Sequence, residues 1–127
     1  MPTVLCIDDD VNWLELEKNT LETNGYTVLI TSDGPTGITL ASENPIDVVV
    51  LAFKMRGMNG GEVAEVLLRC QPDLPIVLCT GFLVAVPEWL RWLAAACVEK
   101  LDGPDVLLST IPEVIAHKKV SGQAVAA

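Results

Sequence analysis

Short apolar runs alternate with longer amphipathic segments along the whole chain. The runs predict strands at residues 4–7, 26–31, 46–51, 76–80 and 95–99. The spacing of apolar residues between them predicts helices, which we expect to begin near Asp10, Pro35, Glu62, Pro87 and Pro104. Strands this apolar leave no face for solvent, so they indicate a parallel sheet covered on both sides. The predicted fold is α/β, with a doubly wound five-stranded parallel sheet in a three-layer sandwich.

Cap and turn residues set the expected ends of the helices. Asp10 is a suitable N-cap, and Asn24-Gly25 is a suitable helix stop, because glycine tolerates the left-handed conformation. Pro112 is expected to kink or end the last helix, since it cannot donate a backbone hydrogen bond. The first helix is expected to bury a stripe formed by Val11, Leu14 and Leu21. A flexible connection is expected at Gly57, Gly60 and Gly61.

Length and composition indicate one globular domain. The chain has 127 residues, half of them hydrophobic, which argues against disorder outside the ends. We expect a domain over residues 1–119 and a flexible tail over residues 120–127. The formal net charge is −9 and the eight cationic residues are scattered, so we expect no nucleic-acid partner.

Membrane insertion, disulfide bonds and histidine chemistry are also disfavoured. No apolar stretch approaches the ~20 residues of a membrane-spanning helix, and the chain does not open on a signal segment. The four cysteines show no CxxC spacing and lie in apolar segments, as buried thiols of a reducing cytoplasm would. The single histidine, His117, leaves little material for histidine-based catalysis.

Polar residues of complementary kinds follow the predicted strands. Asp8 and Asp9 end the first strand, Thr80 ends the fourth and Lys100 follows the fifth, whereas the third ends at Ala52. The carboxyl ends of parallel strands meet at one edge of the sheet, where ligands bind. Two acids can hold a hard cation, and a hydroxyl and an ammonium can engage anionic oxygens. Together they suit a phosphoryl group and its magnesium ion.

Simpler interpretations exist for several of these residues. Asp10 is better explained as a helix cap than as a ligand. Thr80 alone would be an ordinary strand residue and Lys100 alone a solvated one. Trp89 and Trp92, three residues apart on a short predicted helix, are either core residues or an apolar partner-binding surface.

Four stretches resemble the CheY-like receiver domain of bacterial two-component response regulators over nearly the whole chain. They are residues 4–10, residues 47–60 with the Met-x-Gly-Met-x-Gly loop, residues 75–81 and residues 98–100. The resemblance implies a flavodoxin-like fold and a signalling module rather than an enzyme. It implies a sensor histidine kinase or phosphotransfer protein as partner, with an output partner or a homodimer also possible, and it favours the interaction-surface interpretation of the two tryptophans.

The resemblance also assigns roles at the strand ends. It implies that Asp8, Asp9 and the backbone carbonyl of Lys54 hold Mg²⁺, and that Thr80 and Lys100 engage the phosphoryl oxygens. It puts Ala52 where the family has its phosphoacceptor aspartate. An alanine methyl has no lone pair, so residue 52 cannot accept a phosphoryl group, and Mg²⁺ binding should be weak or absent with one acid fewer.

Other departures accompany Ala52. Arg56 replaces the proline usual in the loop, Leu101 replaces the proline usual after the lysine, and Cys97 stands where a switching aromatic is common. The chain is therefore either a natural degenerate receiver or a deliberate non-phosphorylatable variant, and the sequence leaves both open.

Two other functions compete with the signalling module. One is a protein–protein interaction module in which the acidic edge is vestigial. The other is a phosphohydrolase of the haloacid dehalogenase type, because Asp8-x-Asp10 after a strand fits that family's opening motif. The hydrolase would need a larger chain, a cap and a later acid pair, and the sequence supplies none of them.

Overall fold

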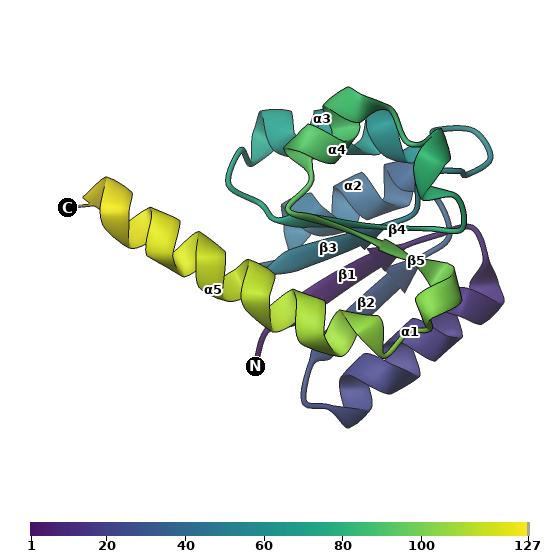
Figure 1. Cartoon of the computed structure of the whole chain (residues 1–127), viewed down its shortest axis with the longest axis horizontal. Coiled ribbons are helices and arrows are strands. Elements are labelled where there is room, and N and C mark those ends of the chain that lie inside the picture. Colours follow the sequence, from purple (N-terminus) through teal and green to yellow (C-terminus); the bar gives the residue numbers. More distant parts are fainter. Residues whose placement is uncertain (127) are drawn as a thin grey trace.

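A single parallel sheet forms the centre of the molecule (Figure 1). The computed structural model describes the backbone of residues 1–126 and the side chains of residues 1–118. The strands lie in the order β2-β1-β3-β4-β5. Their bounds are β1 Thr3–Ile7, β2 Thr27–Thr31, β3 Val48–Leu51, β4 Ile76–Thr80 and β5 Ala96–Glu99. All four strand pairs are parallel, as the apolar runs predict.

Helices cover both faces of the sheet, so the doubly wound three-layer sandwich is confirmed. One face carries α1 (Val11–Thr23) and α5 (Val106–Ala126). The other carries α2 (Gly34–Glu43), α3 (Gly60–Cys70) and the short α4 (Glu88–Leu93). Two single 3₁₀ turns that the sequence analysis did not predict, Leu83–Ala85 and Lys100–Asp102, follow β4 and β5.

The core divides into two clusters because neighbouring strand residues point to opposite faces. Leu5 and Ile7 of β1 pack with α2, α3 and α4, whereas Val4 and Cys6 pack with α1 and α5. All four side chains are at most 1% exposed. This two-sided burial fixes the register of β1 and therefore the position of the residues that follow it.

The ends of α1 agree with the sequence, but its buried stripe does not. Asp10 caps the helix by accepting a hydrogen bond from the Trp13 N–H at 3.2 Å, and Gly25 has a φ of 92° just after the helix. Val11 was expected on the buried stripe and is 59% exposed, because it opens the helix at the rim of the sheet. Glu17 instead completes the inner face with Leu14 and Leu21.

The glycines after β3 are not a flexible connection. Gly57 does adopt a left-handed φ of 75°, but Gly60 and Gly61 are buried in the first turn of α3. The Gly60 N–H donates to the Phe53 carbonyl at 2.7 Å, and a Cβ atom on Gly60 would collide with the carbonyl of Ala52. Glycine is needed here for the close approach of α3 to the end of β3.

The last helix rules out one of the two effects expected of Pro112. Pro112 lies inside α5, which continues to Ala126, so the helix does not end at the proline. The expected tail, residues 120–127, falls outside the residues whose side chains the structure describes, and the division of the chain after residue 119 stays a prediction. Within residues 1–126, no helix combines the length and apolar character that crossing a membrane requires.

Candidate functional site

The strand ends meet in a small pocket at one edge of the sheet. Ile7 pairs with Leu51, which puts Asp8 beside Ala52, and the Ala52 N–H donates to the Ile7 carbonyl at 2.9 Å. The cavity is about 130 Å³, well below the ~300–1,000 Å³ of common ligand pockets, so it suits a small group rather than a large cofactor. Its lining includes three of the predicted strand-end residues, Ala52, Thr80 and Lys100.

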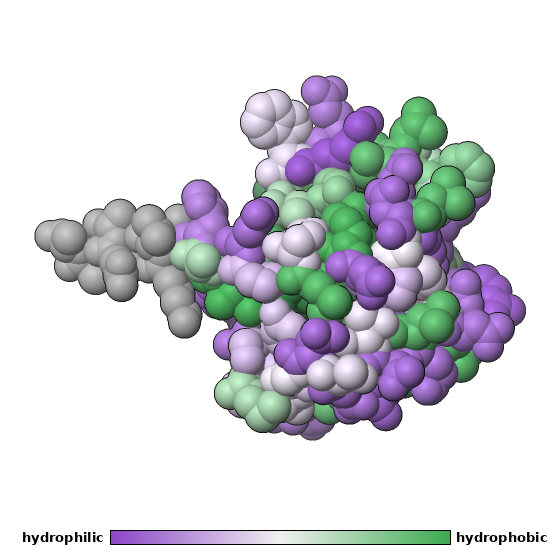
Figure 2. Space-filling view, turned by 60° about the horizontal axis from the view of Figure 1, so that its bottom comes forward, coloured by the Kyte–Doolittle hydropathy of each residue, from purple (hydrophilic) through white to green (hydrophobic). Residues whose placement is uncertain are grey.

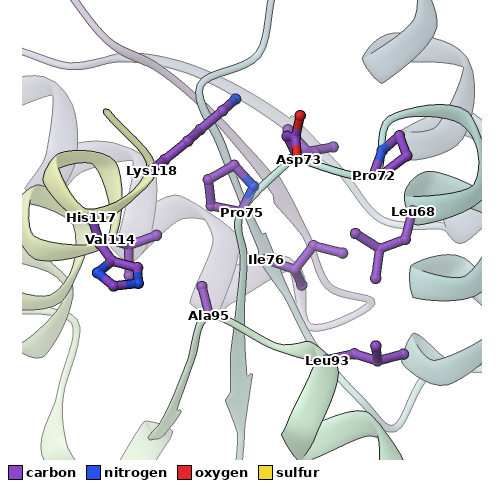
Figure 3. Close-up of a pocket in the computed structure, with 11 residues that line it drawn as sticks. Leu68, Pro72, Asp73, Pro75, Ile76, Leu93, Ala95, Val114, His117 and Lys118 are labelled. Atoms are coloured by element: carbon purple, nitrogen blue, oxygen red, sulfur yellow. The ribbon is translucent and has the colours of Figure 1, made fainter. Parts of the chain in front are cut away.

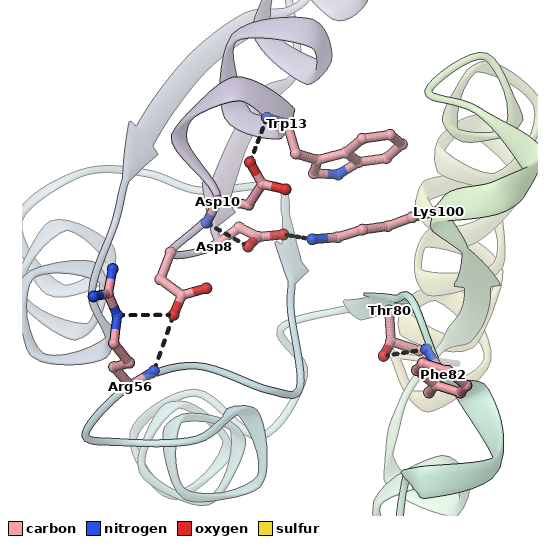
Figure 4. A network of polar contacts seen from close by, with 8 residues as sticks. Asp8, Asp10, Trp13, Arg56, Thr80, Phe82 and Lys100 are labelled. Atoms are coloured by element: carbon pink, nitrogen blue, oxygen red, sulfur yellow. Dashed lines mark hydrogen bonds and ion pairs between the residues drawn. The ribbon is translucent and has the colours of Figure 1, made fainter.

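Lys100 reaches across this edge to Asp8. The Lys100 Nζ lies 2.6 Å from Asp8 Oδ2, and the Asp8 side chain is only 3% exposed (Figure 4). The other carboxylate oxygen, Oδ1, accepts a hydrogen bond from the Asp10 N–H at 2.9 Å. Burial raises the pKa of Asp8, and the hydrogen bond and charge of Lys100 oppose that rise. The ammonium also lies 5.5 Å from the centroid of the Trp13 ring, within cation–π range.

Asp9 has a different partner, in the loop after β3. Its Oδ2 accepts a hydrogen bond from the backbone N–H of Arg56 at 3.0 Å, and the Arg56 Nε lies 3.7 Å from the same oxygen. The guanidinium side chain is 92% exposed, so the ion pair itself contributes little. The backbone hydrogen bond is the firmer contact, and a proline at residue 56 could not make it.

Ala52 and Thr80 line the same cavity with very different chemistry. Ala52 is 4% exposed and offers only a methyl group. The Thr80 hydroxyl accepts a hydrogen bond from the Phe82 N–H at 3.2 Å and is also buried. Cys79 borders the pocket as well, but burial, followed by the charge of Glu17, raises its thiol pKa to about 12. The thiol therefore stays protonated at neutral pH and is no substitute nucleophile.

Glu17 is the residue of this region that the sequence analysis missed. It is 1% exposed, and within the described side chains its Oε2 and the Trp13 indole nitrogen are buried without a hydrogen-bond partner. Burial and then the charge of Asp8 raise the pKa of Glu17 to about 8, against the opposing effects of Trp13 and Lys100. A signal was available, because residue 17 falls on the same helical face as Leu14 and Leu21.

The two predicted acidic magnesium ligands already have partners within the protein. Within the described side chains, no group of three acidic, histidine or cysteine residues is placed to hold a metal ion. Asp8 is already paired with Lys100, and Asp9 with Arg56. Lys54 borders the pocket, but the assignment of its carbonyl as a third ligand stays a prediction.

The two tryptophans of α4 are not core residues. Trp89 is 44% exposed and Trp92 is 80% exposed, so the core interpretation is wrong. Other large apolar side chains are also exposed, namely Phe82 and Val84 after β4, Leu93 at the end of α4 and Leu101 after β5. Figure 2 shows apolar residues reaching the surface of the folded body among polar ones. Their role as an interaction surface stays a prediction.

A larger cavity of about 530 Å³ lies at the amino-terminal end of β4, away from the strand-end pocket (Figure 3). Its walls are mainly apolar and include Leu74, Ile76 and Val114, with His117 and Lys118 from α5. It contains no residue assigned to the phosphoryl or metal site.

Comparison with known proteins finds relatives that are named as response regulators or transcriptional regulatory proteins. Response regulator MprA of Mycobacterium sp. strain KMS is 36% identical over 104 residues, which cover 82% of this chain and 45% of that protein. The transcriptional regulatory protein ZraR of Klebsiella oxytoca is 25% identical over 93% of this chain and 27% of its own length. The chain thus spans less than half the length of these curated relatives.

Solved structures agree with the fold in detail. Response regulator TrrA of Thermotoga maritima, crystallised in complex with Mg²⁺-BeF, has a TM-score of 0.84 at 27% identity, over 90% of this chain and 99% of that chain. A receiver domain from Clostridium thermocellum has a TM-score of 0.86 at 27% identity, over 94% and 98% of the two chains. The response regulator receiver domain family matches residues 4–111, and the chain belongs to that family of signalling modules.

Proposed function

We propose that this chain is a receiver module of a two-component pathway that is not phosphorylated at residue 52 and signals through binding. The observation that carries the proposal is the buried methyl of Ala52 at the end of β3, which lines one pocket with Thr80 and Lys100. Phosphoryl transfer needs a nucleophilic atom with a lone pair in line with phosphorus, and the methyl supplies none. A sensor histidine kinase or phosphotransfer protein is the proposed upstream partner.

A mass measurement tests the proposal directly. The chain is incubated with acetyl phosphate and Mg²⁺ and its intact mass is followed with time. We expect no phosphoryl adduct on the wild-type chain. A stable adduct, mapped by proteolysis to a residue of the strand-end pocket, would overturn the proposal.

Restoring the acid provides the matched control. In Ala52→Asp, a carboxylate oxygen could attack phosphorus and release acetate, and an adduct should form if the rest of the pocket is competent. Thr80→Ala in the same background should lower the yield, because a hydroxyl lining the pocket is removed. If Ala52→Asp also stays unmodified, the pocket has lost more than one function, and the interaction-module alternative gains support.

The proposed contact surface is the exposed apolar side chains around α4. Burying residues such as Trp92 and Phe82 against a partner would remove apolar area that is costly to leave in water. We propose a second copy of the chain as the first partner to test, by sedimentation of wild type and Trp92→Ser. A concentration-dependent dimer that Trp92→Ser weakens would support this surface, and a monomer at all concentrations would direct the search to an output protein.

A further inference from the structure

The two acids at the end of β1 each already have a positively charged or donating partner from within the chain. Asp8 lies against the Lys100 ammonium at 2.6 Å, and Asp9 accepts the Arg56 backbone N–H at 3.0 Å. Neighbouring carboxylates repel one another and require compensation, which a divalent cation commonly provides. Here protein groups provide contacts to both acids.

Two departures from the family pattern act together in this arrangement. The end of β3 offers Lys100 only the methyl group of Ala52, and the ammonium pairs with Asp8. Arg56, at the position of the usual proline, provides an N–H that proline lacks, and this N–H is the group that Asp9 binds.

The pair with Lys100 is also placed where it is difficult to displace. The Asp8 side chain is 3% exposed and that of Lys100 is 23% exposed, so water competes weakly for either charge. A cation entering this pocket would have to remove the ammonium from Asp8 and leave it in partly desolvated surroundings. Leaving one buried charge without its partner is strongly unfavourable.

We propose that Lys100, assisted by the Arg56 backbone N–H, takes the place of the metal ion, so that the strand-end pocket is a metal-independent ion-pair site. The inference concerns the same pocket as the proposed function but depends only on its geometry. The intact mass of the chain tests whether it accepts a phosphoryl group, and its thermal stability tests whether it binds Mg²⁺. Either proposal can therefore fail while the other holds.

The test is a titration with MgCl₂ at constant ionic strength, following thermal unfolding by circular dichroism. We expect no saturable stabilisation of the wild-type chain up to about 10 mM Mg²⁺, because a ligand that binds the folded state stabilises it by mass action. Lys100→Met, which keeps most of the length but not the charge, should bind Mg²⁺ at least about tenfold more tightly than wild type, since it frees the Asp8 carboxylate beside Asp9. Lys100→Arg keeps the charge and should stay unresponsive.

Two further variants separate the contributions. Arg56→Pro removes the backbone N–H and should raise the Mg²⁺ response, whereas Arg56→Ala removes only the exposed guanidinium and should not. Lys18→Met, on α1, controls for the loss of one positive charge and should behave as wild type.

Three results would overturn the inference. They are saturable Mg²⁺ binding by wild type below about 10 mM, a folded Lys100→Met with no gain in affinity, and an equal gain in Lys18→Met. If Lys100→Met folds only with Mg²⁺, the metal replaces the ammonium and the inference holds. If Lys100→Met does not fold at all, the wild-type titration decides. Saturable stabilisation of the wild-type chain by Mg²⁺ would then contradict the inference, and no stabilisation would support it.

Discussion

The buried carboxyl of Glu17 makes a strong prediction about stability and pH. We consider Glu17→Gln, which keeps the shape of the side chain but cannot ionise. The wild-type pKa of this group rises from 4.5 to about 8 on folding, chiefly because of burial. The folded chain therefore holds the proton more tightly than the unfolded chain, so stability is fully present below about pH 4.5 and falls as the pH rises towards 8.

The magnitude follows from that difference in pKa. At about 1.4 kcal/mol for each tenfold change in proton affinity, the wild-type chain should lose roughly 3 kcal/mol between pH 4.5 and pH 7. The loss should level off at roughly 5 kcal/mol above pH 8. Glu17→Gln does not incur this loss. The variant should resemble wild type near pH 4.5 and be more stable by roughly 3 kcal/mol at neutral pH.

Urea unfolding followed by circular dichroism at a series of pH values measures this difference. Titrating groups remote from residue 17 affect both chains alike, so the difference between the two curves reports Glu17 together with its coupling to Asp8, Lys100 and Cys79. Glu15→Gln, on the exposed side of the same helix, is the matched control and should show no comparable gain. A pH-independent difference, or a variant no more stable than wild type near pH 8, would refute the reasoning about burial.

Five simpler substitutions probe the frame of the domain, each by urea unfolding. Asp10→Ala removes the cap of α1 and should cost about 1 kcal/mol, and a cost near zero would show that the cap contributes nothing. Gly60→Ala places a methyl against the backbone at the end of β3 and should cost about 2–3 kcal/mol, more than the roughly 1 kcal/mol expected for Gly25→Ala, where only φ is strained. Leu90→Ala should lower the free energy of unfolding by about 2–5 kcal/mol because the side chain is fully buried. Trp92→Ala should change it by no more than about 0.5 kcal/mol. Equal losses would contradict the assignment of core and surface on α4.

The sheet could be predicted from the sequence because its signal is local. Each buried strand is a short apolar run, and residues such as Asp10 and Gly25 act on the backbone within a few positions of themselves. The meeting of Ala52, Thr80 and Lys100 was also predictable, because the carboxyl ends of parallel strands converge whatever their side chains are.

The partners within the site were not predictable in the same way. The Lys100–Asp8 pair joins residues far apart in sequence, and the choice between Asp8 and Asp9 depends on side-chain reach. The Arg56 contact uses a backbone N–H, which every residue but proline has. The residue type therefore does not indicate that this N–H binds Asp9. The spacing of residues on the first helix does place Glu17 on the buried face. It was missed because a buried face is expected to be apolar, which favours Val11 over a carboxyl group.

The position of Trp13 gives the pocket an optical reporter of its own. Its indole is half-buried beside the Lys100 ammonium, whereas the other two indoles, on α4, are open to solvent. Iodide should quench the emission of the α4 pair first, and the shielded remainder should come from Trp13. Replacing both α4 tryptophans by phenylalanine would leave one fluorophore, whose colour and lifetime would register any rearrangement of the lysine beside it.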